Sequence, residues 1–218
     1  MKWNSIETFF LDLDGTLLDL AFDNFFWHEH LPYVYANSKD IEFKKAKEDF
    51  EKMYKNKENS IQWYSLSYWS KILEIDLCSE LLRVKNKIRT LNNSEKFLQI
   101  LKEREVRIYL LTNCPRYMLH VKLNQVRFWK FFDEIISSED FGYPKETDEF
   151  WNLLQKKFKY KKTSTVFIDD SKSVLDFSIK SGLNNVFLVS NPDSNKEKQK
   201  TDGYKSIDSL VDFSKLII

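Results

Sequence analysis

Short apolar runs alternate with amphipathic segments along much of the chain. The runs that resemble buried strands cover residues 8–13, 106–112, 134–137, 164–169 and 185–189. Apolar residues recur at three- and four-residue spacing between these runs, which predicts helices over 95–105, 147–158 and 172–181. Strands that alternate with helices predict an α/β fold in which a parallel sheet is covered on both faces.

Residues 20–92 interrupt this alternation. They contain no convincing buried strand, but they contain aromatic-rich helical patterns at 22–35, 41–56, 61–73 and 79–90. We therefore predict a Rossmann-like core built from residues 1–19 and 93–218, with residues 20–92 inserted as a helical domain. Beyond the last strand, we expect a polar surface excursion over 190–205 and a final amphipathic helix over 206–217.

Composition narrows the class of protein. The 218 residues are 42% hydrophobic and 31% charged, which is typical of a soluble globular chain. The 34 basic and 33 acidic residues leave a net charge of +1, which argues against a nucleic-acid partner. Asp12, Asp14 and Asp19 break the N-terminal apolar run, so it does not read as a secretory signal or a membrane segment. We expect a cytoplasmic protein, and nothing in the sequence indicates a protein partner.

Polar side chains that suit phosphate chemistry follow the predicted strands. Ligands of parallel α/β sheets bind outside the carboxyl ends of the strands, so residues at these ends should converge. They are Asp12, Asp14, Gly15 and Thr16 in DLDGT, then Thr112 and Asn113, then Lys145 in GYPK, and then Asp169, Asp170 and Ser171.

Four converging carboxylates are costly without a cation. Two like charges about 4 Å apart repel by about 4 kcal/mol at an effective dielectric constant near 20. The acids must therefore raise their pKa values or recruit positive charge. Oxygen ligands suit a hard ion such as Mg²⁺, which also binds phosphate, and Lys145 adds one further charge. The cluster predicts a Mg²⁺ cofactor and an anionic small-molecule substrate.

Asp12 and Asp14 lie two residues apart, and a turn at Gly15 would give them different surroundings. One carboxylate can then act as an ionised nucleophile while the other carries a proton. The backbone N–H groups of Gly15 and Thr16 could hold phosphoryl oxygens.

The ordered set of DLDGT, Thr112, Lys145 and Asp169-Asp170 resembles the haloacid dehalogenase superfamily, with a helical cap of its C1 type. The Asp12 and Asp14 pair is similar to that of its phosphatase branch. This resemblance implies that Asp12 attacks phosphorus and forms an aspartyl phosphate. It also implies that Asp14 protonates the leaving alcohol and later deprotonates the hydrolytic water.

The same resemblance implies ligands for the metal and the phosphoryl group. Mg²⁺ would be held by the Asp12 carboxylate, the Asp14 backbone carbonyl and Asp170, with Asp169 as a ligand or a hydrogen-bonding neighbour. Thr112 and Lys145 would bind phosphoryl oxygens. Many members carry a further acid where this chain has Val174, so the division of roles between Asp169 and Asp170 stays open.

Longer stretches resemble the bacterial GMP/IMP 5′-nucleotidases of this superfamily. They are LLDLAFDNFFWHEHLP, QWYSLSYW, LLTN, FGYPKE, FIDDS and NPDS, and they include the cap. This resemblance implies Mg²⁺-dependent hydrolysis of a purine nucleoside 5′-monophosphate. A phosphatase for a sugar phosphate or phosphoglycolate, a phosphomutase, and a binding protein on a retired phosphatase scaffold remain alternatives.

Cap residues are candidates for recognition of the rest of the substrate. Asp23 and Asn24 directly follow the first motif, so they can face the cleft and bind a base or ribose. The many aromatic residues of the cap predict mainly a packed core, with one or two left to stack on a purine. His28 and His30 lie two residues apart on a predicted helix and point in different directions, which argues against a shared metal site. Both are expected at the surface.

Overall fold

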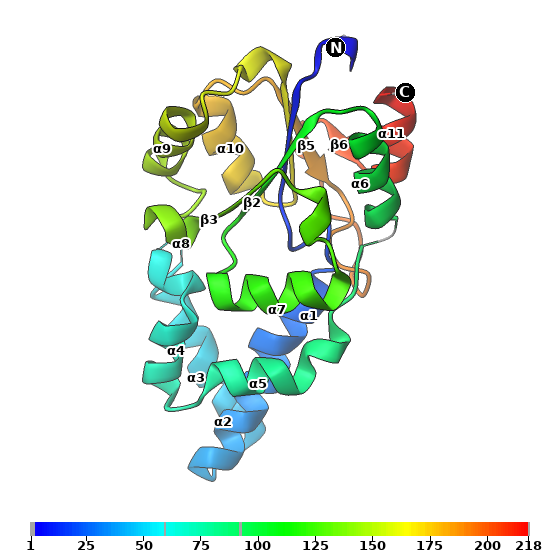
Figure 1. Ribbon diagram of the computed structural model, residues 1–218. Helices are drawn as coiled ribbons and strands as arrows, with labels where there is room; N and C mark the ends of the chain where they lie inside the picture. The colour runs from blue at the N-terminus through cyan, green and yellow to red at the C-terminus, as the bar shows by residue number, and fades with distance from the viewer. Residues whose placement is uncertain (1–2, 59, 92, 218) are drawn as a thin grey trace.

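One parallel sheet organises the upper half of the molecule in Figure 1. The computed structural model describes residues 3–58, 60–91 and 93–217. Within this part of the chain the sheet has six strands in the order β3-β2-β1-β4-β5-β6. The strands are β1 (Thr8–Leu11), β2 (Arg107–Thr112), β3 (Glu134–Ser137), β4 (Thr165–Asp169), β5 (Asn185–Val189) and β6 (Ser206–Ile207). The predicted α/β class with a parallel sheet is confirmed.

Side chains that alternate along β1 divide the core into two layers. Phe9 and Leu11 belong to a buried cluster that also contains residues of α6 (Ser94–Glu103), α7 (Arg116–Val126) and α11 (Leu210–Ile217). Phe10 points to the opposite face, where α9 (Asp148–Phe158) and α10 (Lys172–Lys180) cover the sheet. In Figure 1, α6 and α11 lie on one side of the strands and α9 and α10 on the other. A period of two along a strand produces this division, because successive side chains point to opposite faces.

Helices inserted between β1 and α6 form the lower half of the molecule (Figure 1). We call them the inserted helices: α1 (Ala21–Phe25), continued by a π-helical turn (Phe26–His30) into α2 (Leu31–Lys39), then α3 (Phe43–Lys55), α4 (Leu66–Leu73) and α5 (Leu77–Val84). Phe26, Phe50 and Trp69 are buried among them. Their cluster is continuous with the core that covers β1, so the division at residues 19/20 and 92/93 stays a prediction.

Two chain segments that connect the halves lie side by side. The backbone N–H of Asp19 donates to the carbonyl of Arg89 at 3.0 Å, and that of Leu91 donates to Leu17 at 2.9 Å. The segments that lead into and out of the inserted helices are therefore joined by backbone hydrogen bonds.

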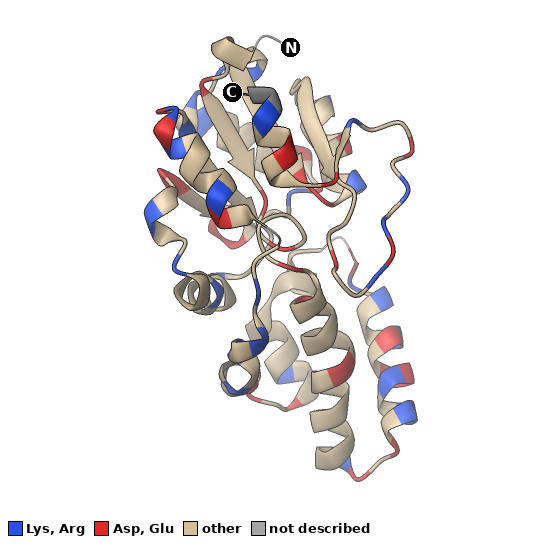
Figure 2. Ribbon diagram, turned by 90° about the vertical axis from the view of Figure 1, so that its right-hand side faces the viewer, with Lys and Arg blue, Asp and Glu red and all other residues tan. Residues whose placement is uncertain are grey.

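The remaining elements are short. The helix α8 (Ser138–Phe141) follows β3, and 3₁₀ turns occur at Trp3–Ser5, Ile61–Tyr64, Lys85–Lys87, Trp129–Phe131 and Lys162–Ser164. Charged residues of both signs are interspersed over the ribbon in Figure 2, in keeping with the small net charge. Within the described residues, no helix is long and apolar enough to cross a membrane.

Two local predictions differ from the structure. Residues 206 and 207 form strand β6 beside β5, and the final helix begins only at Leu210. A two-residue strand leaves no readable period, since only its backbone pairing with Leu188 and Val189 defines it. Helix α7 was not predicted. Its buried residues, which include Lys122, do not form one apolar stripe along the sequence.

Candidate functional site

The first motif turns sharply at the end of β1. The backbone N–H of Asp12 donates to Ile168 at 3.0 Å, which continues the pairing of β1 with β4 by one residue. Gly15 then adopts a φ of +86°, and its N–H donates to Leu18 at 2.7 Å. A Cβ at Gly15 would lie 2.4 Å from Oδ2 of Asp170. The turn therefore needs glycine both for its backbone conformation and for space beside the last motif.

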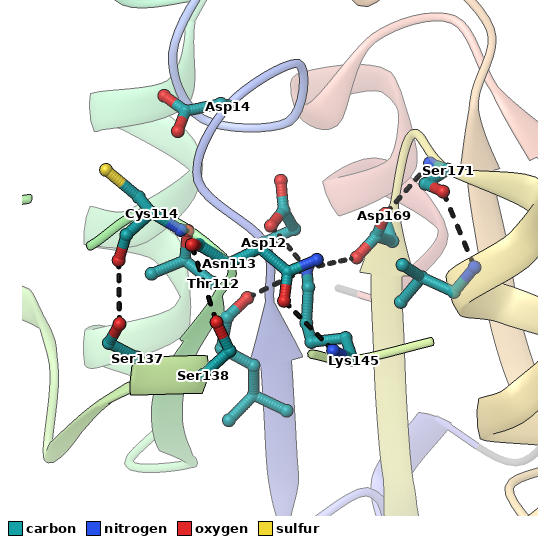
Figure 3. A network of polar contacts seen from close by, with 12 residues as sticks. Asp12, Asp14, Thr112, Asn113, Cys114, Ser137, Ser138, Lys145, Asp169 and Ser171 are labelled. Atoms are coloured by element: carbon teal, nitrogen blue, oxygen red, sulfur yellow. Dashed lines mark hydrogen bonds and ion pairs between the residues drawn. The ribbon is translucent and has the colours of Figure 1, made fainter. Parts of the chain in front are cut away.

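Lys145 joins the ends of two neighbouring strands, β1 and β4. Its Nζ donates to Oδ1 of Asp12 at 2.5 Å, to Oδ2 of Asp169 at 2.7 Å and to the carbonyl of Leu111 at 3.1 Å. Figure 3 shows Asp12, Lys145 and Asp169 together at the strand ends. The backbone N–H of Lys145 donates to Oδ1 of Asn113 at 2.9 Å. This hydrogen bond holds the backbone from which the Lys145 side chain extends.

Asp12, Asp169 and Asp170 form a cluster of carboxylates. Each offers an oxygen atom, and these oxygens lie within 4.8 Å of one another. Burial raises the pKa of Asp12 to about 8, against the opposing charge of Lys145. Burial also raises the pKa of Asp169, and it raises that of Asp170 well above its ordinary value with help from the Asp169 and Asp12 charges.

The cluster lacks enough positive charge from the protein. Lys145 pairs with Asp12 and Asp169, but in the described chain no lysine or arginine forms an ion pair with Asp170. Three oxygen donors around one point, with an acid left unpaired, fit a hard divalent cation. Their role as metal ligands, and Mg²⁺ as the ion that they bind, stay predictions.

Asp14 lies apart from this cluster on the loop above β1 (Figure 3). Its Oδ1 is 2.7 Å from Nζ of Lys122, a fully buried lysine on α7. The same Nζ lies 2.7 and 2.8 Å from the two carboxylate oxygens of Asp23 on α1. Burial and the charge of Asp14 raise the pKa of Asp23 to about 7. Burial alone would lower the pKa of Lys122, but the two carboxylates outweigh it and raise that pKa.

Residues after β2 connect the site to the inserted helices. Thr112 is buried, and its Oγ1 accepts from the N–H of Cys114 at 3.0 Å. The Nδ2 of Asn113 donates to Oε2 of Glu146 at 2.8 Å. The hydroxyl of Tyr64 donates to Oε1 of the same glutamate, also at 2.8 Å. Glu146 therefore bridges the strand end and the segment just before α4.

A cavity of about 290 Å³ unites these groups. All nine residues predicted for the site line it: Asp12, Asp14, Asp23, Asn24, Thr112, Asn113, Lys145, Asp169 and Asp170. The side chains of Asp23 and Asn24 are already engaged by protein, since Asp23 contacts Lys122 and Nδ2 of Asn24 donates to Oδ2 of Asp193 at 2.6 Å. Their predicted role in recognising a base or ribose stays a prediction.

The aromatic residues of the inserted helices differ in burial and in whether they line the cavity. Phe22 and Phe26 are buried in the core, whereas Trp27, Trp63 and Tyr64 are half-buried and line the cavity. His28 was expected only at the surface. Its side chain is exposed but also lines the cavity, and burial on one side lowers its pKa.

Sequence reasoning missed three groups of the site. Lys122, Glu146 and the hydroxyl of Tyr64 make hydrogen bonds or ion pairs to residues that were predicted. A lysine within the mostly apolar stretch MLHVKL was the available signal for Lys122. Glu146 directly follows Lys145 and could have been considered with it.

Comparisons with known proteins identify relatives of this chain. Residues 6–175 match the family described as haloacid dehalogenase-like hydrolase. The chain is 35% identical over 218 residues to the GMP/IMP nucleotidase YrfG of Escherichia coli, covering 100% of this chain and 96% of that protein. It is equally similar to the protein of the same name from Shigella flexneri.

Solved structures show the same fold at low sequence identity. A HAD phosphatase from Thermococcus onnurineus superposes with a TM-score of 0.79 at 19% identity, covering 97% of this chain and 98% of that one. The L-2-haloacid dehalogenase of Xanthobacter autotrophicus superposes with a TM-score of 0.63 at 13% identity, with 97% and 98% covered.

Proposed function

Because the chain belongs to the haloacid dehalogenase-like hydrolases and is a phosphatase of that family, we propose that it hydrolyses purine nucleoside 5′-monophosphates such as GMP and IMP. The composition of the cavity wall carries this proposal. Carboxylates and Lys145 line it from the sheet, and Trp27 and Trp63 line it from the inserted helices. One wall suits a phosphoryl group, and the other suits a flat aromatic base.

In the first half-reaction, an Asp12 carboxylate oxygen attacks phosphorus while the bond between phosphorus and the 5′ oxygen breaks. The leaving oxygen takes the electron pair of that bond and a proton from the Asp14 carboxyl group. The products are the free nucleoside and an aspartyl phosphate on Asp12. Lys145 is 2.5 Å from Asp12, so its ammonium group can also stabilise charge on the transferring phosphoryl oxygens.

In the second half-reaction, water attacks the phosphorus of the aspartyl phosphate. The Asp14 carboxylate takes a proton from this water, and the bond between phosphorus and the Asp12 oxygen breaks. Inorganic phosphate leaves, and Asp12 returns to its carboxylate form. The same Asp14 side chain thus donates a proton in one step and regains one in the next.

Asp12, Asp169 and Asp170 would hold the divalent cation, which we propose is Mg²⁺, because their oxygen donors lie within 4.8 Å of one another. When bound, the ion supplies positive charge that lowers carboxylate pKa values and stabilises charge on the phosphoryl group. The main chain of Asp14 is a further candidate ligand. Asp169 is already fixed by Lys145 and by the N–H of Ser171 at 2.8 Å, which suits it to orient the site.

Trp27 and Trp63 are the proposed contacts for the purine. Both line the cavity and remain half-buried, so a stacked base would cover aromatic surface that is now partly exposed. Large planar bases gain more from such stacking than the small sugar of a hexose phosphate does. This distinction favours a purine nucleotide over the sugar phosphate and phosphoglycolate alternatives.

Phosphate release from a panel of esters tests the proposal. The panel should contain GMP, IMP, AMP, pyrimidine nucleotides, hexose phosphates and phosphoglycolate, each with Mg²⁺ and with EDTA. We expect GMP and IMP to be preferred and EDTA to abolish turnover. Asp12→Asn should be inactive, whereas Asp212→Asn, which alters an exposed aspartate paired with Lys215, should retain full activity.

Two results would overturn parts of this assignment. A preference for a sugar phosphate or phosphoglycolate would refute the purine substrate while leaving the phosphatase chemistry intact. Isomerised sugar phosphate without release of inorganic phosphate would identify a phosphomutase instead.

A further inference from the structure

We propose that Lys122 is a positioning residue for the reaction, which holds the Asp14 carboxylate in the orientation needed at the leaving oxygen. The inference rests on the proposed function in assigning proton transfer to Asp14. It adds a residue outside the strand-end motifs, and it links that residue to the inserted helices through Asp23.

The geometry around Lys122 is that of a fixed three-way junction. Its side chain is fully buried, and its Nζ lies 2.7 Å from Asp14 Oδ1. It also contacts both oxygens of Asp23, at 2.7 and 2.8 Å. The ammonium group donates hydrogen bonds to the two Asp23 oxygens, and its charge forms an ion pair with the Asp14 oxygen. The side chain therefore has little freedom to turn away from Asp14.

Asp14 needs such a partner because its loop does not orient it toward the metal-binding carboxylates. The cluster near one point contains Asp12, Asp169 and Asp170, and Asp14 is not part of it. Lys145 does not reach Asp14 either, since it pairs with Asp12 and Asp169. In the described chain, Lys122 is the lysine that forms an ion pair with Asp14.

The second carboxylate extends the junction to the inserted helices. Asp23 lies on α1, and the neighbouring Asn24 donates to Asp193 at 2.6 Å. Contacts from α7 and from the loop after β5 thus hold the first of these helices on two sides. The Lys122 ammonium group contacts both Asp23 on α1 and Asp14. A shift of α1 would therefore move the ammonium group and change the orientation of the Asp14 carboxylate.

A positioning role predicts a selective loss of rate. An alkyl phosphate needs protonation of its leaving oxygen, whereas p-nitrophenyl phosphate releases a stable phenolate without it. Misplacing the proton donor therefore slows the first ester far more than the second. Loss of packing or of metal binding would slow both esters equally.

The test compares wild-type protein with Lys122→Met, which keeps the length of the side chain and removes its charge. We expect kcat for the preferred nucleotide to fall about 10- to 100-fold, with less than about 3-fold change for p-nitrophenyl phosphate and little change in KM. Lys130→Met is the matched control, because that lysine lies just after the same helix and is exposed. It should retain both rates.

A second variant covers the chance that Lys122→Met fails to fold because two buried acids are left without a cation. Lys122→Met combined with Asp23→Asn removes one of these acids, and it should fold and keep the same selective defect. Asp23→Asn alone retains Lys122 beside Asp14, so its selective loss should be smaller.

A structure of the double variant supplies a readout that does not depend on activity. We expect the Asp14 carboxylate to leave its wild-type position. An unmoved Asp14, or equal losses on both phosphate esters, would overturn the positioning role. If the wild type prefers an alkyl phosphate other than a nucleotide, the substrate proposal fails, and the same comparison with that ester still decides the role of Lys122.

Discussion

Replacing Gly15 with alanine tests the close fit between the first and last motifs. The new Cβ would lie 2.4 Å from Oδ2 and 2.5 Å from Cγ of Asp170. Real Cβ atoms do not approach that closely, so either the turn or the Asp170 side chain must move. Because Asp12 and Asp170 are proposed metal ligands, movement of either the turn or the Asp170 side chain changes the metal site.

Two costs add in Gly15→Ala. The φ of +86° costs an alanine about 1–2 kcal/mol. Overpacking against Asp170 costs about a further 1–3 kcal/mol. The sum predicts a loss of about 2–5 kcal/mol in the free energy of unfolding, together with weaker binding of the cation.

Gly203→Ala separates these two costs. Gly203 has a φ of +88°, close to that of Gly15, but nothing lies within 4 Å of a Cβ built there. It should therefore show only the backbone cost. Urea unfolding without metal measures the free-energy difference between the two variants, and titration calorimetry with Mg²⁺ measures the binding. Equal unfolding free energies and equal metal affinities in both variants would refute the reasoning.

Three further substitutions or labelling results are expected. Lys145→Met should lower kcat about 10²- to 10³-fold in a phosphate-release assay, because it removes a donor beside the phosphoryl group, and a loss below 10-fold would contradict this role. Tyr64→Phe removes the 2.8 Å hydrogen bond to Glu146. A double-mutant cycle with Glu146→Gln should give a coupling energy of about 1 kcal/mol in the free energy of unfolding. Zero coupling would argue against a stabilising contact between Tyr64 and Glu146. Burial raises the pKa of Cys114 well above its ordinary value, so iodoacetamide at pH 8 should modify the less buried Cys78 first, and equal rates for the two thiols would count against the described packing.

Glu146 shows how the two halves of the molecule meet at the site. One oxygen accepts from Asn113 beside the strand end, and the other accepts from Tyr64 beside α4. Burial and the Glu146 charge raise the pKa of Tyr64, so its hydroxyl stays protonated and remains a donor. The protonated hydroxyl can therefore keep donating to Glu146.

The sequence by itself determined five of the six strands of the described chain and the polar residues that follow them. Short apolar runs in the strands and a spacing of three to four residues in the helices are local properties, so they can be recognised without knowledge of packing. Parallel strands that share one direction must bring their carboxyl ends to one edge. Asp12, Thr112 and Asp169 stand at strand ends, so the sequence places them together. Lys145 follows β3 and α8 and lines the same cavity.

Only the tertiary structure decided which side chains pair around that rim. Lys122 meets Asp23 across 99 residues, and Tyr64 meets Glu146 across 82. Such pairs depend on how helices pack against a sheet, and no local pattern encodes that packing. The same packing turned Asp23 toward a lysine and left Trp27 facing the cavity, because burial of the inserted helices sets which face of each helix remains accessible.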